Sequence, residues 1–152
     1  MKNILLISIL LLTSLSINAQ TIKITVSEAQ IFARFGTHTN EEIFKAPDVD
    51  EGIKQIDCDY TFDLQEKTST FFSRSLGGEG NTLPIHNVIK NGNLYILEIA
   101  DHGRHDASSS YPVKIYVDIE NETMLYTWYD PYLERSFVSA CWKLKMTLEG
   151  MQ

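Results

Sequence analysis

Apolar and polar residues alternate along much of this chain, and a period of two is typical of β-strands that bury one face. Every second residue from Ile56 to Leu64 is apolar, and the residues between them are Asp or Thr. The stretch from Val113 to Ile119 alternates in the same way. Each such strand should turn one face to a core and the other to water. The pattern predicts an all-β fold and gives little support for helices.

We expect a single antiparallel domain of about eight or nine short strands. The links between the strands are mostly too short for the long crossovers that parallel strands need. The expected strands are Glu28–Phe35, Glu41–Ala46, Ile56–Leu64, Thr68–Arg74, Leu83–Lys90, Asn93–Ala100, Val113–Ile119, Met124–Tyr129 and a C-terminal strand through Val138–Met146.

Turn residues support this division. Asn91-Gly92 fits a type I′ hairpin turn, because both central residues of that turn need a positive φ. Gln65–Lys67 and the residues around Asn121 predict two further tight connections.

The segment Glu28–Phe35 has a second interpretation. Its apolar residues alternate, but Ile31 and Phe35 also stand about one helical turn apart. We favour a strand, followed by a turn at Gly36–Asn40 and a loop at Pro47–Gly52. A short helix in this region is the alternative that would change the strand count.

Such a succession of strands forms either a closed meander barrel or a β-sandwich. In length, expected export and strand order the chain resembles the lipocalin-like barrels of the calycin group. The Gly-x-Trp motif of that group is absent near the first strand, and Trp128 and Trp142 both lie near the C-terminus. The resemblance therefore concerns architecture, and it assigns no ligand or site residue.

The N-terminal residues 1–19 predict a secretory signal peptide. Lys2 precedes a short apolar core, and Ala19 is the small residue expected before the cleavage point. The nearest cysteine is Cys58, so no lipid-modified cysteine would follow the cut. We expect residues 20–152 to form one exported bacterial domain, periplasmic or secreted, with no membrane anchor after cleavage.

The charge balance limits the partners. The chain has 13 basic and 20 acidic residues, for a net charge of −7, and its Lys and Arg residues form no run. Binding to phosphates depends on clustered Lys and Arg. The composition therefore argues against a nucleic-acid partner or an anionic membrane surface.

The two cysteines, Cys58 and Cys141, leave two interpretations open. An even number in an exported chain suggests a disulfide. The alternation, however, places Cys58 on the apolar face of its strand and Cys141 on the polar face of its own, so a bridge would need a β-bulge. The alternative is a pair of unbridged thiols, one of them buried.

The loop around residues 101–106 is the densest group of metal-capable side chains. Asp101, His102, His105 and Asp106 would hold a divalent ion if the loop folded back on itself. Histidines three residues apart on extended backbone point to opposite sides, so a purely polar connection is the alternative. A metal-binding or hydrolytic role at this loop is the second functional hypothesis.

Aromatic residues support a different hypothesis. Tyr126, Trp128, Tyr129 and Tyr132 cluster in one segment, and large side chains occupy both faces of its strand. One face is available for a small apolar ligand, a glycan or a protein partner, unless a second layer of protein packs on it.

Catalytic and nucleotide-binding motifs are absent from the sequence, including Gly-x-Ser-x-Gly, the Walker A loop and the dinucleotide fingerprint. The sequence therefore favours a binding module that needs no cofactor over an enzyme. An exported inhibitor or interaction protein with an acidic face is a further alternative.

Overall fold

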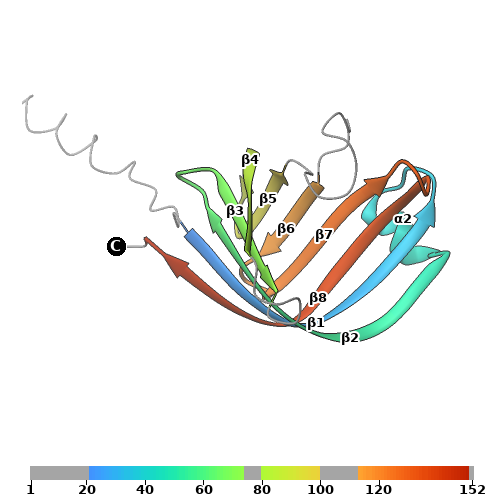
Figure 1. The fold of residues 1–152 in the computed structure, drawn as a ribbon, viewed down its shortest axis with the longest axis horizontal. Helices are drawn as coiled ribbons and strands as arrows, with labels where there is room; N and C mark the ends of the chain where they lie inside the picture. The colour runs from blue at the N-terminus through green and yellow to red at the C-terminus, as the bar shows by residue number, and fades with distance from the viewer. Residues whose placement is uncertain (1–20, 74–79, 100–112, 151–152) are drawn as a thin grey trace, which may run out of the picture.

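A computed structural model describes residues 21–73, 80–99 and 113–150. Within these ranges the chain forms eight strands and one short helix (Figure 1). In chain order they are β1 (Thr21–Phe35), α2 (Asn40–Lys45), β2 (Val49–Asp63), β3 (Thr68–Ser73), β4 (Gly80–Asn91), β5 (Leu94–Ile99), β6 (Val113–Asp118), β7 (Thr123–Asp130) and β8 (Arg135–Glu149). The predicted signal peptide lies outside the described residues.

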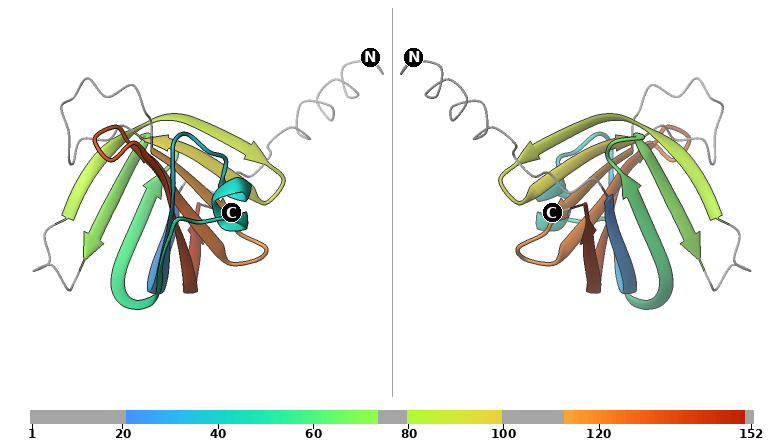
Figure 2. Two further views of the ribbon diagram at one scale, coloured as in Figure 1. Left: turned by 90° about the vertical axis from the view of Figure 1, so that its right-hand side faces the viewer. Right: turned by 90° about the vertical axis from the view of Figure 1, so that its left-hand side faces the viewer.

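The eight strands form a closed antiparallel barrel. Each strand pairs with the next, and β8 pairs with β1 along almost its whole length, from Thr21 opposite Glu149 to Phe35 opposite Arg135. The two end views in Figure 2 show the strands following one another around the barrel. The expected antiparallel all-β fold is confirmed, and of the two proposed architectures the structure has the barrel and not the sandwich.

Inward-facing side chains pack tightly at one end of the barrel. Ile22, Phe62, Leu97 and Met124 are each completely or almost completely buried there. These residues come from four strands that are far apart in the sequence, so the core forms only when the barrel closes. The alternation of Ile56–Leu64 has the predicted phase, because Cys58 and Phe62 are both buried.

Strands β1 and β8 change phase near their middle. In β1, Val26 is buried in the core, yet the next inward residue is Ala29, three positions later. The register of β1 against β2 shifts at the same place, between Val26 and Glu28. In β8 the inward face changes near Lys143, whose φ of 50° lies in the left-handed region. These bends allow the long strands to curve around the barrel in Figure 1.

Three hairpins share one turn design. In each, an Asp ends the first strand and its Oδ1 accepts hydrogen bonds from the backbone N–H groups two and three residues later. A residue with φ near 50° then leads into the next strand. The pairs are Asp63 with Lys67, Asp118 with Glu122 and Asp130 with Glu134. The turns predicted at Gln65–Lys67 and Asn121 are confirmed, and the Asp side chains explain why they form there.

The predicted hairpin at Asn91-Gly92 is present but lies one residue further along the chain. Asn91 pairs with Leu94, so Gly92 and Asn93 are the central residues of the turn. Gly92 has a φ of 60°, whereas Asn93 does not have a positive φ. A positive φ at the first central position alone is the pattern of a type II′ turn, which glycine favours there. The type I′ assignment was therefore wrong.

The region between β1 and β2 also differs from the expectation. Glu28–Phe35 is a strand, as favoured, but the expected strand at Glu41–Ala46 is the helix α2, and β2 begins at Val49 inside the expected loop. The helix starts at Thr39, whose hydroxyl accepts a hydrogen bond from the Glu42 N–H while the Glu42 carboxylate accepts one from the Thr39 N–H. This reciprocal capping stabilises a helix start.

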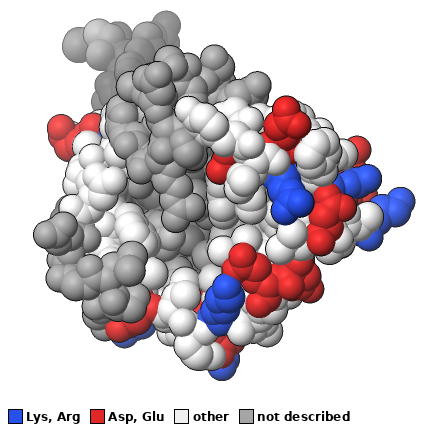
Figure 3. Space-filling model, turned by 45° about the vertical axis from the view of Figure 1, so that its right-hand side comes forward, with Lys and Arg blue, Asp and Glu red and all other residues white. Residues whose placement is uncertain are grey.

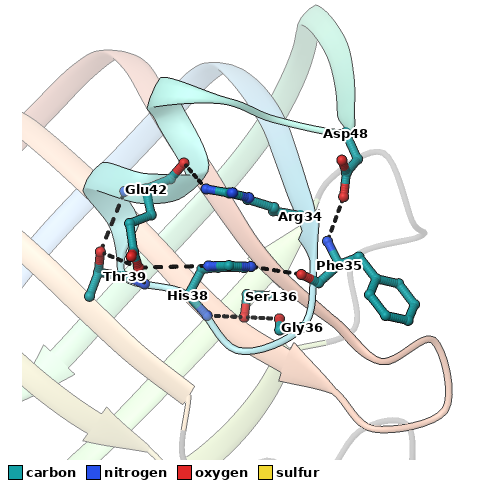
Figure 4. Close-up of polar contacts among 8 residues, drawn as sticks. All are labelled: Arg34, Phe35, Gly36, His38, Thr39, Glu42, Asp48 and Ser136. Carbon is teal, nitrogen blue, oxygen red and sulfur yellow. Dashed lines mark hydrogen bonds and ion pairs between the residues drawn. The ribbon is translucent and has the colours of Figure 1, made fainter.

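Helix α2 covers the outer face of β1 and β8. Phe44 contacts Phe32, with ring centroids 5.1 Å apart, and Val138, which pairs with Phe32, is completely buried. Figure 4 shows how the preceding turn is fastened: the Ser136 hydroxyl donates to the Gly36 carbonyl at 2.8 Å and accepts from the His38 N–H at 3.0 Å. Within the described ranges, α2 is the single helix, and its six residues are too few to cross a membrane.

Candidate functional site

Beyond the packed end, the barrel contains a cavity of about 490 Å³ that is partly open to solvent. All eight strands contribute to its wall. The aromatic lining residues are Tyr60, Phe71, Tyr126 and Trp128. The aliphatic ones are Ala29, Ile31, Ile56, Leu83, Ile99, Val113 and Ile115, and the remaining ones are Cys58, Ser69, Asn81 and Ser139. The cavity is therefore mainly apolar, with a few hydroxyl, amide and thiol groups.

Ring contacts hold two sides of the cavity in place. On β7, Tyr126 and Trp128 meet edge to face at 5.8 Å, and Trp128 stacks on Phe137 of β8 at 4.9 Å with the ring planes 5° apart. On β2 and β3, the rings of Tyr60 and Phe71 lie 5.1 Å apart. Such contacts give the aromatic side chains fixed positions, so the shape of the cavity exists before any ligand enters.

The surroundings of the cavity disfavour negative charge. Burial raises the pKa of the Tyr60 hydroxyl well above its ordinary value. Burial also raises the pKa of the Cys58 thiol, and it raises the pKa of Cys141 to about 12. In each case burial removes the hydration that stabilises the charged form, and contacts inside the barrel do not fully compensate for this loss. The three groups are therefore neutral at physiological pH.

Both cysteines are buried inside the barrel as free thiols, so the suggested disulfide is not present in this structure. The prediction that Cys141 lies on the polar face of its strand was wrong. Cys141 pairs with Ala29 and Met124, which face inward, because β8 changes phase only after this residue. A raised pKa makes a thiol a poor nucleophile, so neither cysteine is suited to covalent catalysis.

We expect both thiols to be unreactive in the folded protein. Ellman's reagent at about pH 8 needs a thiolate, and a pKa near 12 leaves very little of Cys141 in that form. After denaturation without reductant, two thiols per chain should react rapidly. A denatured protein with no reactive thiol would show that Cys58 and Cys141 are bridged.

The four aromatic residues that were predicted to form one contact surface lie on two different sides of the barrel wall. Tyr126 and Trp128 line the cavity. Tyr129 follows Trp128 in the strand and so takes the outer face, and Tyr132 lies in the turn before β8 with 70% of its surface exposed. The structure therefore brings together two of the four residues. Whether any of them contacts a ligand stays a prediction.

Tyr60 and Phe71 are the aromatic wall residues that the sequence analysis did not include in the predicted contact surface. Tyr60 occupies an inward position of the alternating segment Ile56–Leu64, and that was its available signal, whereas Phe71 and Phe72 are adjacent in a segment that does not alternate. Alternation does not distinguish an inward residue that fills the core from one that borders a cavity.

The predicted metal loop, Asp101, His102, His105 and Asp106, lies outside the described residues. In the part of the chain that the structure does describe, no group of three or more His, Cys, Asp or Glu side chains is placed to hold a metal ion.

His38, Glu42 and Ser136 form a polar cluster at the start of α2, and their contacts support the turn and the helix. Nε2 of His38 lies 2.7 Å from the Phe35 carbonyl oxygen, and Nδ1 lies 3.7 Å from the Glu42 carboxylate. The nearby Ser136 hydroxyl contacts the backbone of His38 and not its ring. In this geometry the imidazole does not activate the serine, as a hydrolytic pair would require.

No protein-family model matches the sequence, and no curated protein matches it. The cavity is therefore the feature of the molecule from which a function is inferred.

Proposed function

We propose that this protein binds a small, mainly apolar molecule inside its barrel and acts as a binding or carrier protein rather than as an enzyme. The observation that carries the proposal is the aromatic-lined cavity of about 490 Å³. Cavities of roughly 300–1,000 Å³ with mainly apolar walls and a few polar groups are typical of small-molecule sites. From the first nineteen residues we also propose that the protein works outside the cytoplasm.

The outer surface gives less support to a charged protein partner. Lys and Arg side chains lie beside Asp and Glu on the face shown in Figure 3. Lys23 pairs with Glu149 at 2.6 Å. Such mixed charges are typical of a solvated surface. An acidic contact face is therefore the weaker hypothesis.

The two tryptophans allow the site of binding to be tested directly. Trp128 lines the cavity, whereas Trp142 is 40% exposed on the outside of the barrel. We expect ω-bromoundecanol, a neutral alcohol with bromine at the far end of its chain, to quench Trp128 because bromine quenches tryptophan only at close contact. Fluorescence of the Trp142→Phe variant, which retains Trp128, should fall saturably as the alcohol is added.

The Trp128→Phe variant is the matched control, because it retains only the outer tryptophan. Its fluorescence should change little over the same range, and unbrominated undecanol should reverse the quenching of Trp128 by displacement. Equal quenching in both variants would indicate attachment to the outer surface. An absence of quenching in both variants would contradict the proposed function.

A further inference from the structure

We infer that the molecule held in the cavity is uncharged: a neutral apolar compound with a hydroxyl, carbonyl or ester group, and not a carboxylate such as a fatty acid anion. This inference rests on the proposed function and specifies its ligand class. Long-chain alcohols and their carboxylates have nearly the same size and shape, so charge is the property on which the cavity would discriminate.

The lining residues carry the first part of the argument. All fifteen that the structure describes are uncharged side chains. Among their polar groups, Ser69, Ser139 and Asn81 offer hydroxyl and amide groups, which suit a neutral hydrogen-bonding group on a ligand. Burial of a carboxylate without a cationic partner is strongly unfavourable, and the described lining residues include no cationic side chain.

The positions of two nearby lysines carry the second part. Lys114 lies between the inward-facing Val113 and Ile115, so it points to the outer face, where its Nζ lies 3.2 Å from Glu98. Lys143 lies on the outside as well and donates to the Glu28 carboxylate at 2.6 Å. Both ammonium groups are already paired with carboxylates outside the barrel, so neither is placed to neutralise a charge within it.

The barrel's own titratable groups agree with this geometry. Tyr60 and Cys58 line the cavity, and Cys141 lies inside the barrel on the strand that carries Ser139. For all three, burial raises the pKa, which means that the neutral form is favoured over the anion. A ligand carboxylate in the same surroundings would experience the same effect.

A matched series of ligands tests the inference. The quenching of Trp128 would be titrated in the Trp142→Phe variant and in the wild-type protein with ω-bromoundecanol, ω-bromoundecanoate and the methyl ester of that acid. At about pH 8, where the acid is ionised, we expect the alcohol and the ester to bind at least about ten-fold more tightly than the carboxylate. As the pH falls towards the pKa of the acid, its affinity should rise, while those of the alcohol and ester should stay constant.

The outcomes separate the two proposals. If the carboxylate binds at about pH 8 as tightly as the alcohol, the cavity holds a ligand but the inferred neutrality is wrong. If none of the three compounds quenches Trp128, both the proposed function and the inference fail. The inference is supported if the alcohol and the ester bind tightly at both pH values while the acid binds tightly only in its protonated form.

Discussion

Replacing Ser139 by phenylalanine should abolish the binding of ω-bromoundecanol and leave the barrel folded. Ser139 lies on the inner face of β8, and its neighbours in the register are Tyr126 on β7 and Ile31 on β1, which also line the cavity. In the Ser139→Phe variant the added ring would occupy the space that the ligand needs. We expect affinity to fall at least about ten-fold, the equivalent of about 1.4 kcal/mol, when quenching of Trp128 is titrated.

Two further variants identify the cause of such a loss. Ser139→Ala removes the hydroxyl without filling space, so it should lower the affinity for the alcohol far less than Ser139→Phe does. Ile31→Phe adds volume from the neighbouring strand and should weaken binding in the same direction as Ser139→Phe. Circular dichroism would confirm that each variant is folded. A folded Ser139→Phe variant with unchanged affinity would show that the ligand binds elsewhere.

Alternation was sufficient to predict most of the strands and, where the phase is constant, their inward faces. In Ile56–Leu64 the residues at every second position do face the interior, and the short connections do produce antiparallel neighbours. The prediction depended on a local rule, because successive side chains of any strand point to opposite faces. That rule holds along any stretch of strand that has no bulge or bend.

The same rule did not place Cys141 correctly. It assumes a constant phase, and β8 changes phase at the left-handed Lys143, a conformation that the sequence does not mark with glycine. Curvature of a closed barrel imposes such bends on long strands, so they are determined by the fold as a whole.

Helix α2 could have been found from the sequence. Thr39 and Glu42 stand in the spacing of a capping box, which is a signal for a helix start. The acidic residues of the first turn and Lys45 in the last turn suit the helix dipole as well. The segment Glu41–Ala46 does not alternate, because Ile43 and Phe44 are adjacent apolar residues, so no strand pattern opposed these signals.

The cavity could not be predicted from sequence patterns. Phe62 and Phe71 are both inward-facing phenylalanines on adjacent strands, yet Phe62 is completely buried in the packed end while Phe71 borders the cavity. The difference comes from the sum of all inward side chains against the volume that eight strands enclose. No single segment of the chain contains that information.

This difference between the two phenylalanines should appear in the stability of the protein. Phe62→Ala removes a ring with no exposed surface that stacks on Tyr60 at 6.0 Å, so we expect unfolding in urea to lose about 3–5 kcal/mol. A typical domain is stable by only about 5–15 kcal/mol, so the variant should lie near the limit of folding.

Phe71→Ala is the matched test, because this ring also contacts Tyr60 but has the cavity on one side. A ring that borders the cavity makes fewer contacts. Its removal should therefore cost less stability than the removal of the Phe62 ring, by at least about 1 kcal/mol. Phe35→Ala, at a ring that is 59% exposed, should change stability by less than about 0.5 kcal/mol. If Phe71→Ala were as damaging as Phe62→Ala, the space beside Phe71 would be packed with protein in solution. The proposed ligand would then have no cavity to enter.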